Sequence, residues 1–92
     1  MEGVRERIVE FILNDLLLGD ETRLPDGEAS LLETGVMDST GVLELIEFLE
    51  VEFGVAVQDD ETVPANLDGI DRITAYVLRK RYAGAGDHHG AA

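Results

Sequence analysis

The sequence predicts an all-α protein, a four-helix bundle with a long first loop and a short third helix. Three stretches of the chain repeat apolar residues at spacings of three and four, which is the period of an amphipathic helix. The chain has 92 residues and no cysteine. We therefore expect one domain with a modest core, and neither a disulfide nor a thiolate site. We place that domain at residues 1–82 and expect a flexible C-terminal tail over 83–92, which is rich in glycine and alanine.

The first helix is expected near residues 3–17, where charged residues separate the members of one apolar stripe. That stripe consists of Val4, Ile8, Phe11, Ile12 and Leu16. Glycine, proline and aspartate then interrupt the helical period from residue 18 to residue 37. The leucines of this stretch are Leu24, Leu31 and Leu32. We expect them to pin an ordered crossover with a short turn at 29–33, because so long a loop is unusual in a compact domain.

The second helix is expected to begin near Ser39 and to end near Gly54. Its apolar residues recur at helical spacing, and they are Val42, Leu43, Leu45, Ile46, Leu49 and Phe53. Asp38 can accept hydrogen bonds from the first unpaired backbone N–H groups, so we assign it as the N-cap. Ser39 then lies in the first turn, where it is exposed. Gly54 is suited to a left-handed cap at the other end.

Two further helical elements complete the bundle. We expect a short, irregular helical turn at residues 59–64, because acids favour a helix start and Pro64 is tolerated in a first turn. Asp68 is the expected cap of the last helix. The side of that helix facing the core is expected to comprise Ile70, Ile73, Val77 and one of Tyr76 and Leu78. Cations are favoured at its negative end, which would carry Arg79, Lys80 and Arg81.

The net charge of −13 is concentrated in the middle of the chain. No lysine or arginine lies between Arg23 and Arg72, and that stretch holds thirteen acidic residues. A surface of one sign steers basic protein partners and repels nucleic acid, so we expect protein partners and no nucleic acid. The alternative is that acids on a solvated helix face only keep a small protein soluble.

The start of the chain lacks the features of an export signal. No basic region is followed by an apolar stretch and a small-residue cleavage site. No apolar run approaches the length that spans a membrane. We therefore expect a cytoplasmic protein with no membrane association.

Ser39 is the candidate functional residue. The unpaired amides and the dipole of a helix N-terminus favour an anion there. A phosphodiester on Ser39 Oγ would thus be stabilised by the backbone without arginines. The alternative is that a serine beside Asp38 is only capping chemistry, which is common in helical proteins.

Neither catalysis nor a metal centre is expected. A serine nucleophile needs a base within hydrogen-bond reach, and both histidines, His88 and His89, lie in the expected tail. The Gly-x-Ser-x-Gly elbow of serine hydrolases is absent. The acids at 59–61 lack the alternating ligands and the central glycine of an EF-hand loop. We therefore predict no catalytic residue and no built metal site.

Three parts of the chain together resemble an acyl carrier protein over residues 3–81. They are the stretch from Leu32 to Ser39, the acidic helix ending in Phe53-Gly54-Val55, and the last helix after Asn66-Leu67. The resemblance implies that Ser39 is esterified by 4′-phosphopantetheine, transferred from coenzyme A. The thiol of this group would hold an acyl or aminoacyl group as a thioester, which is consistent with the absence of cysteine. Gly35-Val36-Met37 also resembles carriers of aminoacyl or peptidyl units.

The resemblance also implies partners and a pathway class. The partners are a phosphopantetheinyl transferase, an acyl- or aminoacyl-loading ligase, and acyl-accepting enzymes with basic surfaces. The cargo would belong to fatty acid, polyketide or related secondary metabolism, and the carrier would act as a monomer. Its recognition strip is best matched by Asp38, Glu44 and Glu47. Val42 would add an apolar rim or belong to the core, and Ile46 fits the core.

The pair Thr40-Gly41 departs from the family, whose members usually place leucine or methionine directly after the serine. Glycine in the first turns of a helix costs up to about 1 kcal/mol relative to alanine. The residue after the serine lies where partners dock, so we include Thr40 in the strip and expect a specialised carrier. The alternative is an unmodified acidic helical adaptor that docks a basic protein partner, with Ser39 a cap or a phosphorylation site.

Overall fold

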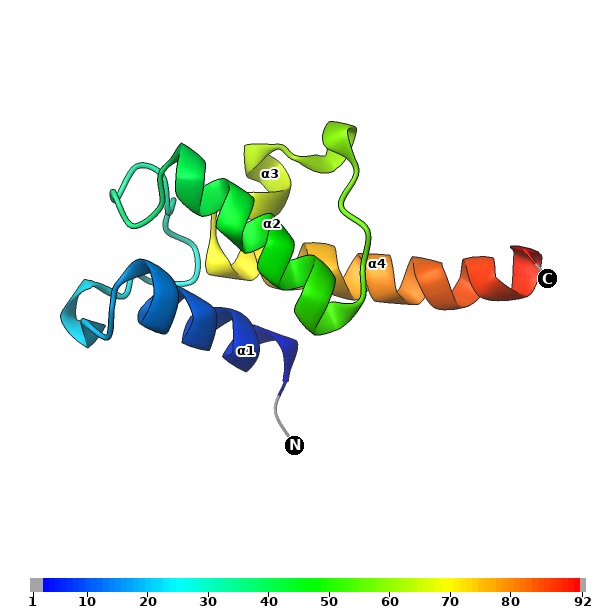
Figure 1. Cartoon of the computed structure of the whole chain (residues 1–92), viewed down its shortest axis with the longest axis horizontal. Helices are drawn as coiled ribbons and strands as arrows, with labels where there is room; N and C mark the ends of the chain where they lie inside the picture. Colours follow the sequence, from blue (N-terminus) through cyan, green and yellow to red (C-terminus); the bar gives the residue numbers. More distant parts are fainter. Residues whose placement is uncertain (1–2, 92) are drawn as a thin grey trace.

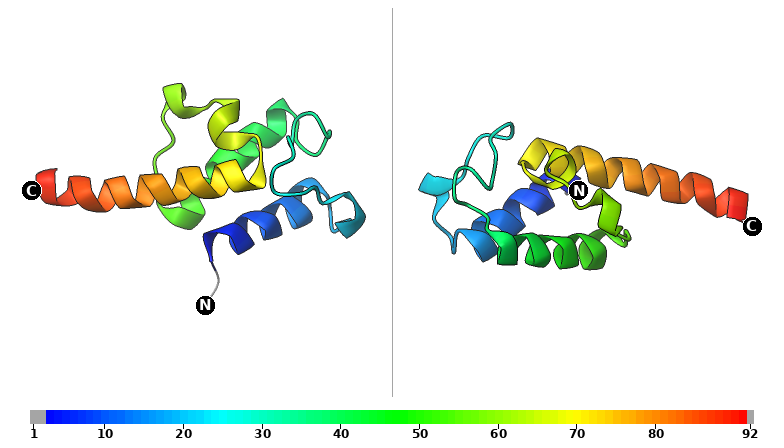
Figure 2. Two further views of the ribbon diagram at one scale, coloured as in Figure 1. Left: turned by 180° about the vertical axis from the view of Figure 1, so that it is seen from behind. Right: turned by 90° about the horizontal axis from the view of Figure 1, so that it is seen from above.

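The computed structural model describes residues 3–91, with side-chain surroundings for residues 3–82. The all-α class is confirmed, since this part of the chain contains four α-helices and no strand. The helices are α1 (Val4–Phe11), α2 (Ser39–Phe53), α3 (Pro64–Leu67) and α4 (Ile70–Ala91). In Figures 1 and 2, α1 and α2 pack beside the N-terminal part of α4, while its C-terminal part extends beyond the bundle. None of the described helices is long and apolar enough to cross a membrane.

The first helix continues beyond α1 as one π-helical turn, η1 (Ile12–Leu16). The backbone N–H of Leu17 donates to the carbonyl of Ile12 at 2.9 Å, which is the spacing of a π-helix. The helical span therefore agrees with the prediction near residues 3–17. It ends at Leu16, and Leu18 just beyond it has a φ of 53° and an 85% exposed side chain.

The core forms where α1, α2 and α4 meet the first long connection. Its largest fully buried side chains are Ile8, Ile12, Leu31, Leu45, Leu49, Ile70, Ile73 and Val77. Leu31 pins the connection as predicted and Leu24 is partly buried against the core, whereas Leu32 is 41% exposed. On α4, Tyr76 faces the core and Leu78 does not.

Three local predictions for the loops and for α4 are wrong. The turn of the first connection lies at residues 31–35 rather than 29–33. The side chain of Asp68 does not cap α4, because it accepts hydrogen bonds from Ser30 and Leu32 instead. The basic residues 79–81 are not at the end of α4, because the helix continues to Ala91. Whether residues 83–92 behave as a flexible tail separate from the domain stays a prediction.

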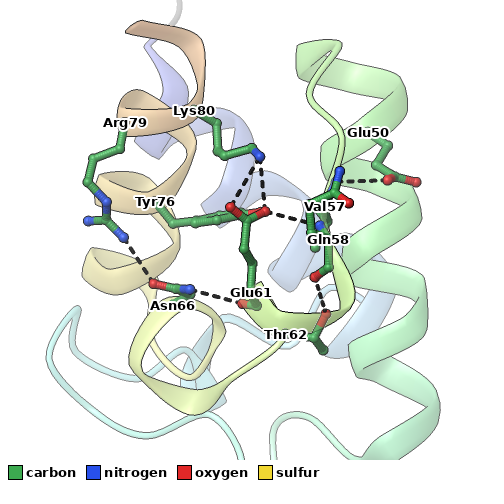
Figure 3. A network of polar contacts seen from close by, with 9 residues as sticks. All are labelled: Glu50, Val57, Gln58, Glu61, Thr62, Asn66, Tyr76, Arg79 and Lys80. Atoms are coloured by element: carbon green, nitrogen blue, oxygen red, sulfur yellow. Dashed lines mark hydrogen bonds and ion pairs between the residues drawn. The ribbon is translucent and has the colours of Figure 1, made fainter. Parts of the chain in front are cut away.

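The second connection is shorter and contains η3 (Asp59–Glu61), followed by α3 with Pro64 in its first turn. Figure 3 shows the carboxylate of Glu61 between this connection and α4. Glu61 Oε1 accepts from the backbone N–H of Gln58 at 3.0 Å and from the Tyr76 hydroxyl at 3.0 Å. Lys80 Nζ donates to the same oxygen at 2.9 Å. These contacts fasten η3 to α4.

Titration of the Glu61 network follows from its contacts. The hydrogen bond from Gln58, and then the one from Lys80, hold the pKa of Glu61 below its ordinary value. Burial, and then the hydrogen bond to the Glu61 carboxylate, raise the pKa of Tyr76. At neutral pH the pair therefore consists of an ionised glutamate and a neutral tyrosine.

Candidate functional site

Ser39 is the first residue of α2, and the residue before it is the cap. Asp38 has an extended backbone, and its Oδ1 accepts a hydrogen bond from the backbone N–H of Gly41 at 2.8 Å. This geometry confirms Asp38 as the N-cap. Ser39 is consequently free of the capping role that the alternative interpretation gave it.

The Ser39 side chain is exposed and accepts or donates no hydrogen bond within the described part of the chain. The first backbone bond inside α2 runs from the N–H of Val42 to the carbonyl of Asp38. The amides of Ser39 and Thr40 precede it, so they face the helix end without an intrahelical acceptor. An accessible hydroxyl thus stands beside two amides and the positive end of a helix dipole, which suits a bound phosphate.

The loop before Ser39 is held by Asp68, a residue whose role the sequence did not reveal. Asp68 is 7% exposed, and its Oδ2 accepts from Ser30 Oγ at 2.5 Å. Its Oδ1 accepts from the backbone N–H of Leu32 at 2.8 Å. The N–H of Met37 in turn donates to the carbonyl of Leu31 at 3.0 Å. Asp68 therefore positions the turn that delivers Asp38 and Ser39 to the start of α2.

Steric crowding where the loop joins α2 explains why position 41 is a glycine. A Cβ atom at Gly41 would lie 3.0 Å from Met37 Cγ and 3.5 Å from Leu16 Cδ2. Met37 is 3% exposed, so it has little room to move. The glycine lets the start of α2 pack closely against the end of η1, which offsets its low helix propensity.

An apolar hollow of about 120 Å³ lies beside the first turns of α2. Its walls come from the first connection, α2 and the segment around α3, and they include Met37, Val42, Val63 and Leu67. Val42 follows Ser39 by three residues, so the two lie on neighbouring positions of the helix surface. The hollow therefore borders the helix position that neighbours Ser39.

Comparison with known proteins agrees with this arrangement. No family model matches the chain. The chain is 28% identical over 76 residues to the probable acyl carrier protein PigG of a Serratia species, an alignment that covers 83% of this chain and 86% of that protein. The chain is therefore similar to an acyl carrier protein over most of its length. This similarity supports a carrier function in general terms.

The predicted recognition strip divides between two sides of α2. Thr40, Glu44 and Glu47 are exposed and are separated by four and three residues, so they share one face. Asp38 lies at the helix start as the cap. Val42 is partly buried and lines the hollow, and Ile46 is likewise partly buried against the core.

Two exposed apolar residues on α2 were missed by the sequence analysis. Leu43, which was counted among the apolar residues of the helix, is 69% exposed, and Val51, which was not, is 81% exposed. They flank Glu47, at spacings of four residues, on the acidic face. A helical wheel could have found them, because Leu45 and Leu49 already define the buried side. The exposed face of α2 is thus both acidic and apolar.

No group of three or more His, Asp or Glu side chains in the described residues is placed to hold a metal ion. The side chains of His88 and His89 lie outside the described residues.

Proposed function

We propose that this protein carries an acyl or aminoacyl group as a thioester on 4′-phosphopantetheine esterified to Ser39. The single observation that carries the proposal is the exposed Ser39 hydroxyl in the first turn of α2, with the capping role already taken by Asp38. In attachment, Ser39 Oγ would bond to phosphorus as the pyrophosphate bond of coenzyme A breaks, its proton would pass to a base of the transferase, and adenosine 3′,5′-bisphosphate would leave. The residues around Ser39 position the hydroxyl and do no chemistry of their own.

The residues around Ser39 fit this phosphodiester. The amides of Ser39 and Thr40 have no acceptor inside α2, and they stand at the positive end of a helix of 15 residues. Such an end stabilises a phosphate charge without a cationic side chain. When bound, the prosthetic group supplies the thiol that the chain itself lacks.

The hollow beside Ser39 supports an apolar cargo. Its lining is mostly aliphatic, with Met37, Val42 and Leu67 among its walls. Apolar surface leaves water favourably when it enters such a site. We infer that the hollow shelters the first carbons of an acyl group, and that fatty acid, polyketide or related secondary metabolism supplies it.

The acidic face of α2 supports partners with basic surfaces, namely a phosphopantetheinyl transferase, a loading ligase and acyl-accepting enzymes. Glu44 and Glu47 stand on the same face as Thr40. Opposite charges steer encounter and set its rate. In this role the protein acts as a cytoplasmic monomer and not as an enzyme.

The first experiment measures intact mass after incubation with coenzyme A and a broad-specificity phosphopantetheinyl transferase. One phosphopantetheine should add to the natural chain and to Thr40→Ala, whose altered side chain is also an exposed hydroxyl at the helix start. Ser39→Ala should gain none. No addition to a folded natural chain, with an active transferase control, would favour the unmodified adaptor instead.

A second experiment tests the acidic face with the same transferase. Glu44→Lys and Glu47→Lys should each lower the modification rate and make it less sensitive to salt, because they remove an attractive charge. Glu28→Lys is the matched control, since Glu28 is exposed on the first connection. An equal effect of all three substitutions would show that only the net charge matters.

A further inference from the structure

A groove runs between α1 and α2 on the side of α2 opposite Ser39. It consists of a hollow of about 280 Å³ and a smaller one of about 150 Å³. Both are lined by Phe11, Asp15 and Phe48, so they form one continuous groove. Ser39 and Phe48 are nine residues apart on α2, which is about two and a half helical turns. The two residues therefore project from opposite sides of the helix.

The floor of this α1/α2 groove is aromatic. The rings of Phe11 and Phe48 stack with their centroids 4.5 Å apart, and Phe53 meets Phe48 edge to face. Val51 extends this apolar surface along one wall and is 81% exposed. An apolar side chain from a partner would leave water on entering this floor.

The rim of the groove is acidic on both helices. Its carboxylates are Glu10 and Asp15 on one wall and Glu44, Glu47 and Glu52 on the other. The basic side chain lining the groove is that of Arg7, which forms an ion pair with Glu52. The rim thus retains excess negative charge, which is complementary to a cationic ligand.

We propose that the α1/α2 groove docks a cationic amphipathic helix of a partner protein. Apolar side chains of that helix rest on Phe11 and Phe48, and its lysines or arginines meet the carboxylates of the rim. Recognition of an amphipathic helix in an apolar groove uses side chains one turn apart. Because Ser39 lies on the other side of α2, a partner docked here leaves the Ser39 hydroxyl accessible. Glu44 and Glu47 belong both to this rim and to the proposed acidic face of α2, so the groove extends that docking surface onto α1 and the inference rests on the proposed carrier function.

The test uses the whole unmodified chain and a synthetic helical peptide as the probe. The peptide carries leucine at positions i, i+3, i+4 and i+7 and lysine at its remaining positions. Amide-resolved NMR titration should place the largest shifts at Phe11, Asp15, Phe48 and Val51. A control peptide with alanine in place of leucine should bind about tenfold more weakly, because it keeps the charge and loses the apolar face. Since no prosthetic group is involved, the outcome is independent of modification at Ser39.

Two substitutions distinguish peptide binding in the groove from nonspecific attraction between the acidic protein and the basic peptide. Asp15→Lys should weaken peptide binding about tenfold, whereas the control Glu28→Lys, away from the groove, should change it less than about threefold. Val51→Glu should also weaken binding, by up to about tenfold, although it adds an attractive negative charge. Both altered residues are exposed, so the fold should persist, which circular dichroism checks.

Three outcomes would overturn the proposal. The first is equal weakening by Asp15→Lys and Glu28→Lys. The second is a set of shifts centred on Ser39, Val42 and α3. The third is a change in the chemical shifts of the groove amides with protein concentration when no peptide is present. That result would show that a second copy of the chain occupies the groove.

Discussion

Two irregular connections frame the hollow beside Ser39, and each is fastened by one carboxylate. The first, residues 18–38, is held by Asp68, which is 7% exposed and accepts from two neutral donors, Ser30 Oγ and the Leu32 N–H. The second, residues 54–63, is held by Glu61, whose side chain is 30% exposed and pairs with the charged Lys80. One wall of the hollow therefore rests on part-buried hydrogen bonds from uncharged donors, and the other on an ion pair that solvent reaches.

The largest expected effect comes from removing the buried carboxylate. Asp68→Ala leaves the Ser30 hydroxyl and the Leu32 N–H without their acceptor, so the free energy of unfolding should fall by about 1–3 kcal/mol. Urea denaturation measures it. Asp71→Ala is the matched control, because Asp71 forms a solvent-exposed ion pair with Arg5 and should cost less than about 1 kcal/mol. Equal losses would show that burial does not distinguish the two connections.

A smaller loss of stability is expected at the second connection. Glu61→Gln keeps the size of the side chain but removes the ion pair with Lys80, so it should destabilise the protein less than Asp68→Ala does. Salt should reduce the difference in the free energy of unfolding between Glu61→Gln and the natural chain, since screening weakens a solvent-exposed ion pair. Asp60→Asn, on the exposed neighbouring residue, is the control. If Glu61→Gln costs the same free energy of unfolding in concentrated salt, the second connection does not depend on an ion pair and does not differ from the first in this way.

The pH dependence of stability tests the role of Glu61 in the second connection. Because contacts with Gln58 and Lys80 lower the pKa of Glu61 from 4.5, its stabilising contribution is present above that value. The contribution is lost as the pH falls through the lower folded pKa. As the pH falls from about 6 to about 3, the midpoint of thermal unfolding should therefore drop more steeply for the natural chain than for Glu61→Gln. Parallel pH profiles for the two chains would contradict this prediction.

The smallest expected effect is a gain, at the start of the first connection. Leu18 has a φ of 53° and is 85% exposed, so it bears backbone strain and contributes little burial. Leu18→Gly should raise the free energy of unfolding by about 0.5 kcal/mol, because relief of strain exceeds the entropic cost of glycine. Leu43→Gly, inside α2, should instead destabilise the protein by about 1 kcal/mol. A decrease for Leu18→Gly would show that this leucine has a stabilising contact.

Much of the fold was predictable because local signals agree with the tertiary structure. The spacing of apolar residues located α1, α2 and the core face of α4, and Asp38 and Gly54 cap α2 as predicted. Asp68 was misassigned because an aspartate before a helix satisfies a local capping rule. Its real partners, Ser30 and Leu32, are 38 and 36 residues away, and no local rule contains them.

Local sequence patterns determined α1, α2, both caps of α2, the acidic middle of the chain and the serine at the start of α2. These features depend on near neighbours, through the helical period, capping bonds and charge. Only the tertiary structure decided which carboxylates hold the connections and that an aromatic groove lies across α2 from Ser39. These depend on side chains brought together from distant parts of the chain, because burial and contact geometry arise only when the helices pack.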